Sequence, residues 1–129
     1  MLLILWIGLF HVSVTVLADT SEQPVFYTEN IESIPDLMQT DKKADFPGGG
    51  SQYCCLVAIS NSLMWLNSNG FPNLVETSEN PFDDQVKLTK LLGSHSYMDT
   101  NLEEGTGTIN IMRCLKKYIH DRGYEIEIF

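Results

Sequence analysis

The sequence is poor in positive charge. It has 8 lysines and arginines against 17 aspartates and glutamates, which gives a net charge of −9. Proteins that bind the phosphate backbone of nucleic acids need clustered lysine and arginine. The shortage of basic residues therefore argues against nucleic acid as a partner. The acidic balance favours solubility and says little about the fold.

Cysteine is scarce as well, with only Cys54, Cys55 and Cys114. Three cysteines are too few for a disulfide framework. The odd count leaves at least one thiol of an exported chain unpaired or paired between chains. No Cys/His spacing resembles a zinc site, so we expect neither a metal nor a cofactor.

Charged residues are absent from residues 1–18, and most of these residues are apolar. An uncharged apolar stretch of this length at the N-terminus is typical of a secretory signal, and Val16 and Ala18 fit a cleavage site. We therefore predict a signal peptide over residues 1–18 and a secreted or periplasmic protein. The alternatives are a buried core helix and a membrane anchor, for which about 20 apolar residues are needed. The membrane is a partner only if the segment is not cleaved.

Residues 19–51 form a polar N-terminal approach segment whose short apolar patches indicate that it lies against the domain. It includes Pro47 followed by three glycines. This cluster predicts either a hinge or close-approach loop or a flexible linker.

Residues 52–129 contain three helical patterns followed by one strand pattern. The helices are expected at residues 52–68, about 82–93 and about 109–122. The first is apolar on nearly every side, which predicts a buried helix. Ser78 or Asn80 is the expected cap of the second helix, and Thr106 or Thr108 that of the third.

Residues 124–129 alternate between apolar and acidic side chains, which predicts a strand. A single strand cannot satisfy its own backbone groups. We therefore expect it to pair either with the 19–51 segment or with strands beyond residue 129.

Cys54 and Cys55 stand at the start of the first predicted helix. A thiol there faces unpaired amides and the positive end of the helix dipole, a placement that brings cysteine pKa values from about 8.5 to roughly 3.5–7.5. The resulting thiolate is a nucleophile, and the same amides can stabilise an oxyanion. A buried structural cysteine is the alternative.

The stretch QYCCLVAISNSLMWL at residues 52–66 resembles the nucleophile helix of bacterial papain-like cysteine peptidases, above all family thirty-nine, the bacteriocin-processing type. Asn61 and the Trp65-Leu66 pair fall at the family's spacing from Cys54. Shorter matches continue in order over about residues 46–125. The resemblance implies an α+β, papain-like fold over 52–129, made of the helical subdomain and the beginning of the β subdomain. It also implies that Cys54 is the nucleophile and that the substrate is a peptide or protein.

Two positions depart from the family pattern. Gly48 stands six residues before Cys54, where the family has glutamine, which leaves Gln52 as the candidate oxyanion donor. The family's catalytic histidine lies well downstream, and the sequence ends before it. His95 either approaches Cys54 or is an exposed loop residue, and His120 is expected to be a solvated helix end.

The sequence is thus interpreted as an exported cysteine peptidase-like protein that is inactive or incomplete, and whether it is an enzyme stays open. The alternatives are a non-catalytic exported helical module that binds a partner through its acidic surface and a truncated gene product that does not fold stably.

Two further motifs carry weaker signals. Residues 105–108, GTGT, precede a helix and could cradle an anion, or form a turn and helix cap. The adjacent pairs Asp83-Asp84 and Glu103-Glu104 do not share a helix face, so we expect solvated acids at these positions.

Overall fold

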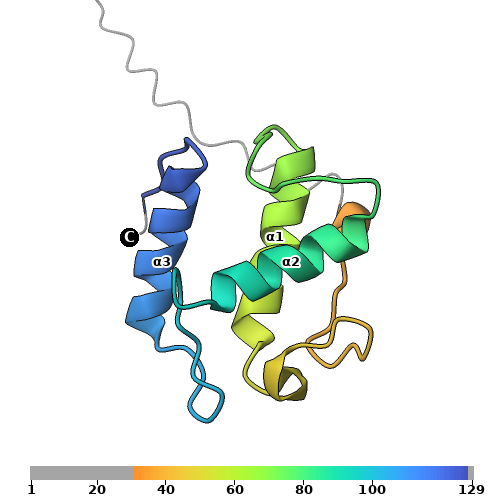
Figure 1. The fold of residues 1–129 in the computed structure, drawn as a ribbon. Helices are drawn as coiled ribbons and strands as arrows, with labels where there is room; N and C mark the ends of the chain where they lie inside the picture. The colour runs from red at the N-terminus through yellow and green to blue at the C-terminus, as the bar shows by residue number, and fades with distance from the viewer. Residues whose placement is uncertain (1–30, 128–129) are drawn as a thin grey trace, which may run out of the picture.

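The structure is a computed structural model that describes residues 31–127. The described part contains three α-helices and two short 3-10 helices: α1 (Cys54–Ser68), α2 (Pro81–Gly93), α3 (Thr108–Asp121), η1 (Ile31–Ser33) and η2 (Pro47–Gly50). Figure 1 shows α2 crossing α1, with α3 standing to one side in roughly the same direction as α1.

The α+β fold predicted from the papain-like resemblance is wrong for the described residues, which contain no strand. Their only β pairing is an isolated bridge between Asn101 and Gly105. Tyr124 and Ile126 are half-buried while the glutamates after each are exposed, so the alternation is present in the packing. No ladder forms, because residues 31–127 offer this segment no second strand. Residues 128–129 and 19–30 lie outside the described residues.

The prediction that α1 is buried on all sides is also wrong. Its residues Leu56, Val57, Ser60 and Leu63 are buried. Cys54, Ala58 and Ser62 are exposed. The apolar composition of α1 therefore overstates its burial, since the described elements leave one of its faces open.

A polar seam made of Ser60, Asn61 and Gln85 joins α1 to α2 and to the approach segment. The side-chain amide of Gln85 on α2 donates to the Ser60 hydroxyl at 3.3 Å and also to the Asn61 carbonyl oxygen. Asn61 in turn accepts from the Leu37 amide at 3.3 Å and donates to the Leu37 carbonyl at 3.4 Å. Because buried polar groups need partners, this seam holds α2 and the approach segment to the same turn of α1.

The approach segment contributes to the core. Leu37, Ala44 and Phe46 are buried together with side chains of all three α-helices. The most completely buried large side chains are Tyr118, Leu56, Leu92 and Met98. The described part of the segment therefore packs against the helices, although of the predicted apolar patches in residues 31–51 only Leu37 is buried, while Ile34 and Met38 are exposed.

The N-terminal caps of α2 and α3 agree only in part with the prediction. Asn80 caps α2, because its side chain accepts from the amides of Phe82 and Asp83. Gly107 occupies the cap position of α3, with no side-chain cap there. The prediction of Thr106 or Thr108 is wrong because Thr108 is already helical and the Thr106 hydroxyl bonds that of Thr100 at 2.7 Å.

The triple glycine is a close-approach loop rather than a flexible linker. Gly50 has φ 80°, and a Cβ built on it would lie 1.8 Å from the Gln39 carbonyl oxygen. The Gln39 side-chain amide donates to the Gly50 carbonyl at 3.0 Å. A residue without a side chain is needed for this contact.

The predicted signal peptide, residues 1–18, lies outside the described residues. Within residues 31–127, no helix has the length and apolar character needed to cross a membrane.

Candidate functional site

Cys54 is the first residue of α1 and its side chain is exposed. Tyr53 precedes it at the cap position and forms no side-chain cap. The first amides of a helix have no intrahelical acceptor, and the helix dipole is positive there. An accessible thiol thus lies beside an uncapped helix start, an arrangement that can accept negative charge.

Tyr53 fixes this end of α1. Its buried ring stacks on Phe46 with centroids 5.1 Å apart. The end of α2 closes over it: a Cβ on Gly93 would come within 3.2 Å of the Tyr53 hydroxyl oxygen and 2.9 Å of Leu56 Cδ1. Burial raises the pKa of the Tyr53 hydroxyl. The start of α1 is therefore held by packing around Tyr53.

Gln52, the candidate oxyanion donor, is half-buried and bound to a neighbouring loop. Its side-chain amide donates to the Glu103 carbonyl at 3.2 Å. Asn101 and Gly105 close that loop with two backbone hydrogen bonds of 3.1 and 2.8 Å. A glutamine amide has two N–H groups, so the contact with Glu103 leaves one for another acceptor.

The other two thiols differ from Cys54 in their surroundings. Cys55 is half-buried, and burial, followed by the charge of Cys54, raises its pKa. Cys114 is buried on α3 and donates to the Tyr97 carbonyl at 2.6 Å. All three described cysteines are free. Among them, the Cys54 side chain is the most exposed to solvent.

Neither described histidine forms a hydrogen bond with Cys54 within residues 31–127. His95 Nδ1 lies 3.1 Å from Asp99 Oδ1 and its side chain is 93% exposed. His120 Nε2 lies 3.8 Å from Glu125 Oε1 and is also exposed. His95 is thus an exposed loop residue paired with its own neighbour, and the described residues supply Cys54 with no general base.

Within residues 105–108, Thr106 is half-buried and Thr108 is exposed. The Thr106 hydroxyl bonds Thr100, and Asn101 Oδ1 accepts from the amides of Glu103 and Glu104 at 2.7 and 3.1 Å. The turn lies just before the motif, at residues 102–104, and within residues 105–108 Gly107 takes the cap position of α3 without a side-chain cap. Among the described residues, no group of three His, Cys, Asp or Glu side chains is placed to hold a metal ion.

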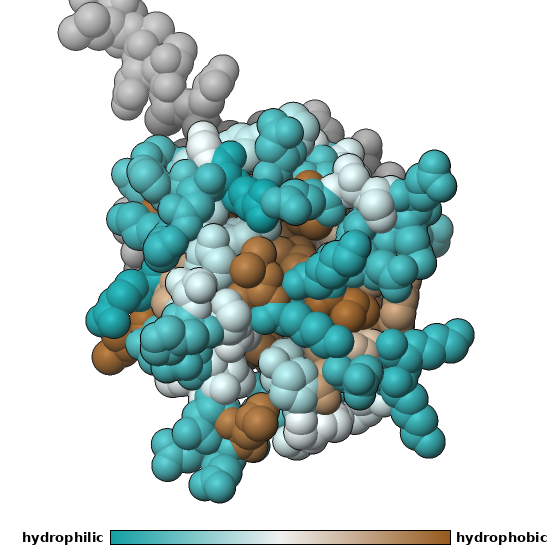
Figure 2. All heavy atoms as spheres, viewed as in Figure 1, coloured by the Kyte–Doolittle hydropathy of each residue, from teal (hydrophilic) through white to brown (hydrophobic). Residues whose placement is uncertain are grey.

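A groove of about 360 Å³ lies elsewhere, between α2, the end of α3 and the loop of residues 75–78. Figure 2 shows hydrophobic surface in the middle of this face, framed by hydrophilic side chains. Neither Cys54 nor Gln52 lines the groove. This groove and the candidate nucleophile are therefore separate features.

Two groove residues have contacts that were not predicted from the sequence. Asp84 is buried and bonded to Ser78 rather than solvated, so the prediction of a solvated acid is wrong at this position. Arg122 reaches Glu76, 46 residues away, with a 3.1 Å ion pair. No local sequence pattern predicts an ion pair between residues this far apart in the chain.

Comparison of the chain with protein-family models, with curated proteins and with solved structures finds no match.

Proposed function

We propose that this chain is an exported thiol protein in which Cys54 acts as a nucleophile toward peptide carbonyl groups, and that its catalytic site is incomplete within residues 31–127. The observation that carries the proposal is the exposed thiol on the first residue of an uncapped helix. Unpaired amides at such a position can stabilise a developing oxyanion.

Turnover requires a base that the described residues do not bring to Cys54. General acid–base catalysis contributes about 10²- to 10⁴-fold. Attack of the Cys54 sulfur on an activated acyl group would release the leaving group and form a thioester. Without a histidine to activate water, the thioester would be hydrolysed slowly. We therefore expect stoichiometric acylation with little turnover.

Iodoacetamide alkylation followed by peptide mass spectrometry tests the nucleophile. Cys54 is expected to react at least about tenfold faster than Cys55 at pH 7, because the Cys54 side chain is exposed while burial raises the Cys55 pKa. Cys114 serves as the buried internal control. Equal rates for Cys54 in the folded chain and in urea would contradict the proposal.

Acylation gives a second test that depends on chemistry rather than exposure. Treatment with p-nitrophenyl acetate should release about one equivalent of p-nitrophenolate and leave one acetyl group on Cys54. Cys54→Ser should abolish this burst, and Cys55→Ser should retain it. A burst that survives in Cys54→Ser would assign the reaction to another residue.

A non-catalytic interaction module is the second candidate, and the exposed face of α3 favours it. Ile109 is 71% and Met112 42% exposed. Arg113 and Lys116 line the same hollow and form no ion pair with any described residue. Apolar side chains beside unpaired cations suit an acidic partner segment. If this second candidate is right, Met112→Glu would weaken binding of the acidic partner segment and Cys54→Ser would not.

A further inference from the structure

We propose that the groove between α2, α3 and residues 75–78 binds a carboxylate attached to an apolar group. This chemistry is shared by the C-terminal end of an apolar peptide and by a medium-chain fatty acid. The groove volume of about 360 Å³ falls within the range of roughly 300–1,000 Å³ that is usual for small-ligand sites. The proposal does not depend on Cys54.

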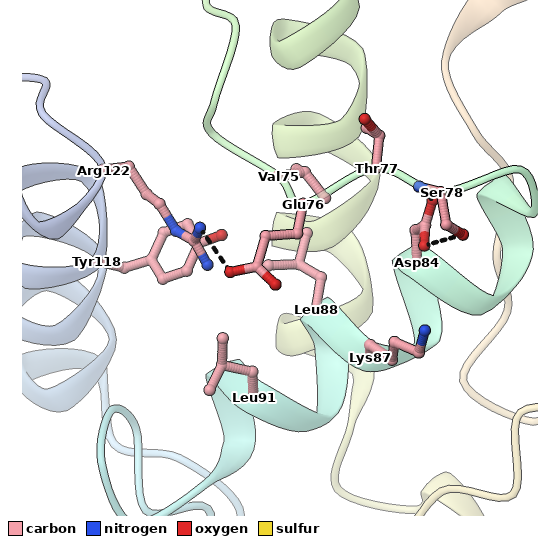
Figure 3. Close-up of a pocket in the computed structure, with 10 residues that line it drawn as sticks. All are labelled: Val75, Glu76, Thr77, Ser78, Asp84, Lys87, Leu88, Leu91, Tyr118 and Arg122. Atoms are coloured by element: carbon pink, nitrogen blue, oxygen red, sulfur yellow. Dashed lines mark hydrogen bonds and ion pairs between the residues drawn. The ribbon is translucent and has the colours of Figure 1, made fainter.

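The floor of the groove is apolar. Val75, Leu88 and Tyr118 are buried beneath it, and Leu91 stays 37% exposed on the α2 side. Figure 3 shows Leu91 projecting from α2 toward the space below Arg122 and Glu76. An apolar ligand group covering Leu91 would remove apolar surface from water, which favours binding.

Arg122 supplies the carboxylate recognition. Its guanidinium lies over the Tyr118 ring at 5.2 Å, and its side chain is only 20% exposed. The Tyr118 hydroxyl is itself held by the Leu74 carbonyl. A guanidinium offers five N–H donors; the contact with Glu76 uses Nη1, and a further side-chain hydrogen bond joins the guanidinium to the Tyr118 hydroxyl. This fixed, partly buried fork suits a bidentate carboxylate.

Glu76 already occupies the position that the ligand carboxylate would take. Its carboxylate lies 3.1 Å from Arg122, but its side chain is 89% exposed. Exposed ion pairs contribute little stability, so a ligand that also covers Leu91 can displace it. The other acid of the groove, Asp84, has one oxygen bonded to the Ser78 amide and the other to the Ser78 hydroxyl, and Lys87 adds positive charge at the rim.

Titration of the ¹⁵N-labelled chain tests the proposal by chemical-shift changes. The probes are N-acetyl-Leu-Leu with a free carboxylate, the same peptide as its C-terminal amide, and octanoate. The free acid should shift the amides of Leu91, Tyr118 and Arg122 and bind at least about tenfold more tightly than the amide. Equal binding of acid and amide, or shifts confined to other residues, would overturn the proposal. Tighter binding of the peptide acid than of octanoate assigns a peptide ligand, and the reverse assigns a fatty acid.

Two substitutions give opposite expected effects. Arg122→Gln should weaken the peptide acid about tenfold or more. Glu76→Gln should strengthen it roughly two- to fivefold, because the internal competitor is removed. The controls are Lys116→Gln, an exposed cation also on α3, and Glu79→Gln, an exposed acid outside the groove.

An ion pair with a purely structural role predicts no gain in Glu76→Gln, and that result would overturn the proposal. If Arg122→Gln does not unfold cooperatively, Arg122→Lys replaces it, since lysine keeps the charge and loses the fork. Unchanged acid-over-amide preference in Arg122→Lys would also overturn the assignment.

Discussion

Ser78 holds the carboxylate of Asp84 with two hydrogen bonds: its amide nitrogen lies 2.6 Å from Oδ2 and its hydroxyl oxygen 2.7 Å from Oδ1. The hydrogen bond from the Ser78 amide has the largest effect and lowers the pKa of Asp84. The hydrogen bond from the Ser78 hydroxyl lowers it further, whereas burial raises it. This contact ties the loop of residues 75–78 to the first turn of α2.

The Asp84 contact predicts a pH dependence of stability. A folded pKa below the unfolded value of about 3.9 means that the contact stabilises the fold above that pH, and that the contribution is lost as the pH falls through the folded pKa. Asp84→Asn should lower the free energy of unfolding at pH 7 and flatten its decline between about pH 5 and pH 2. Urea unfolding across this range measures both effects. Glu79→Gln, an exposed control, should keep the parent slope.

The helix caps predict unequal losses from two similar truncations. Asn80→Ala removes the acceptor for the amides of Phe82 and Asp83 and should cost about 1 kcal/mol. Thr108→Ala changes a residue that does not cap α3 and should stay within about 0.5 kcal/mol. Urea unfolding at pH 7 compares the two variants. An equal loss in both would contradict the assigned caps.

Alanine substitutions at the neighbouring Gly49 and Gly50 should differ in their effect on stability, because only Gly50 has another backbone atom close to it. Gly50→Ala combines φ 80° with a Cβ 1.8 Å from the Gln39 carbonyl oxygen, and should cost about 3 kcal/mol or more. Gly49→Ala has φ 64° but nothing within 4 Å, so backbone strain alone should cost about 1–2 kcal/mol. Thermal and urea unfolding should rank the variants in this order, and the reverse order would refute the close approach.

The core predicts a large effect at Leu56, which is fully buried on α1. Leu56→Ala should lower the free energy of unfolding by about 2–5 kcal/mol, because it removes buried methyl groups and leaves a cavity. Leu102→Ala is the matched control, since Leu102 is 50% exposed, and should change stability by less than about 0.5 kcal/mol. Similar losses at both positions would mean that the α1 packing is wrong.

Structural features that depend on residues close together in the chain could be predicted from the sequence. The first helix was expected at residues 52–68 and is observed as Cys54–Ser68. The helix ends at Ser68, two residues before Gly70, where φ is 109°. Asn80 caps α2, which begins at the next residue, by accepting from the amide of Phe82 two residues away. Each of these features depends on neighbours within one helical turn, so residue type and spacing are sufficient to predict them.

The sequence by itself thus determined where the helices lie and that Cys54 stands at a helix start. Only the tertiary structure decided that the Cys54 face of α1 is open and that Arg122 meets Glu76 across 46 residues. It also decided that the 124–127 segment has no strand partner among the described residues. Exposure, distant ion pairs and strand pairing depend on which elements come together in space, and the periodicity within one element carries no information about that.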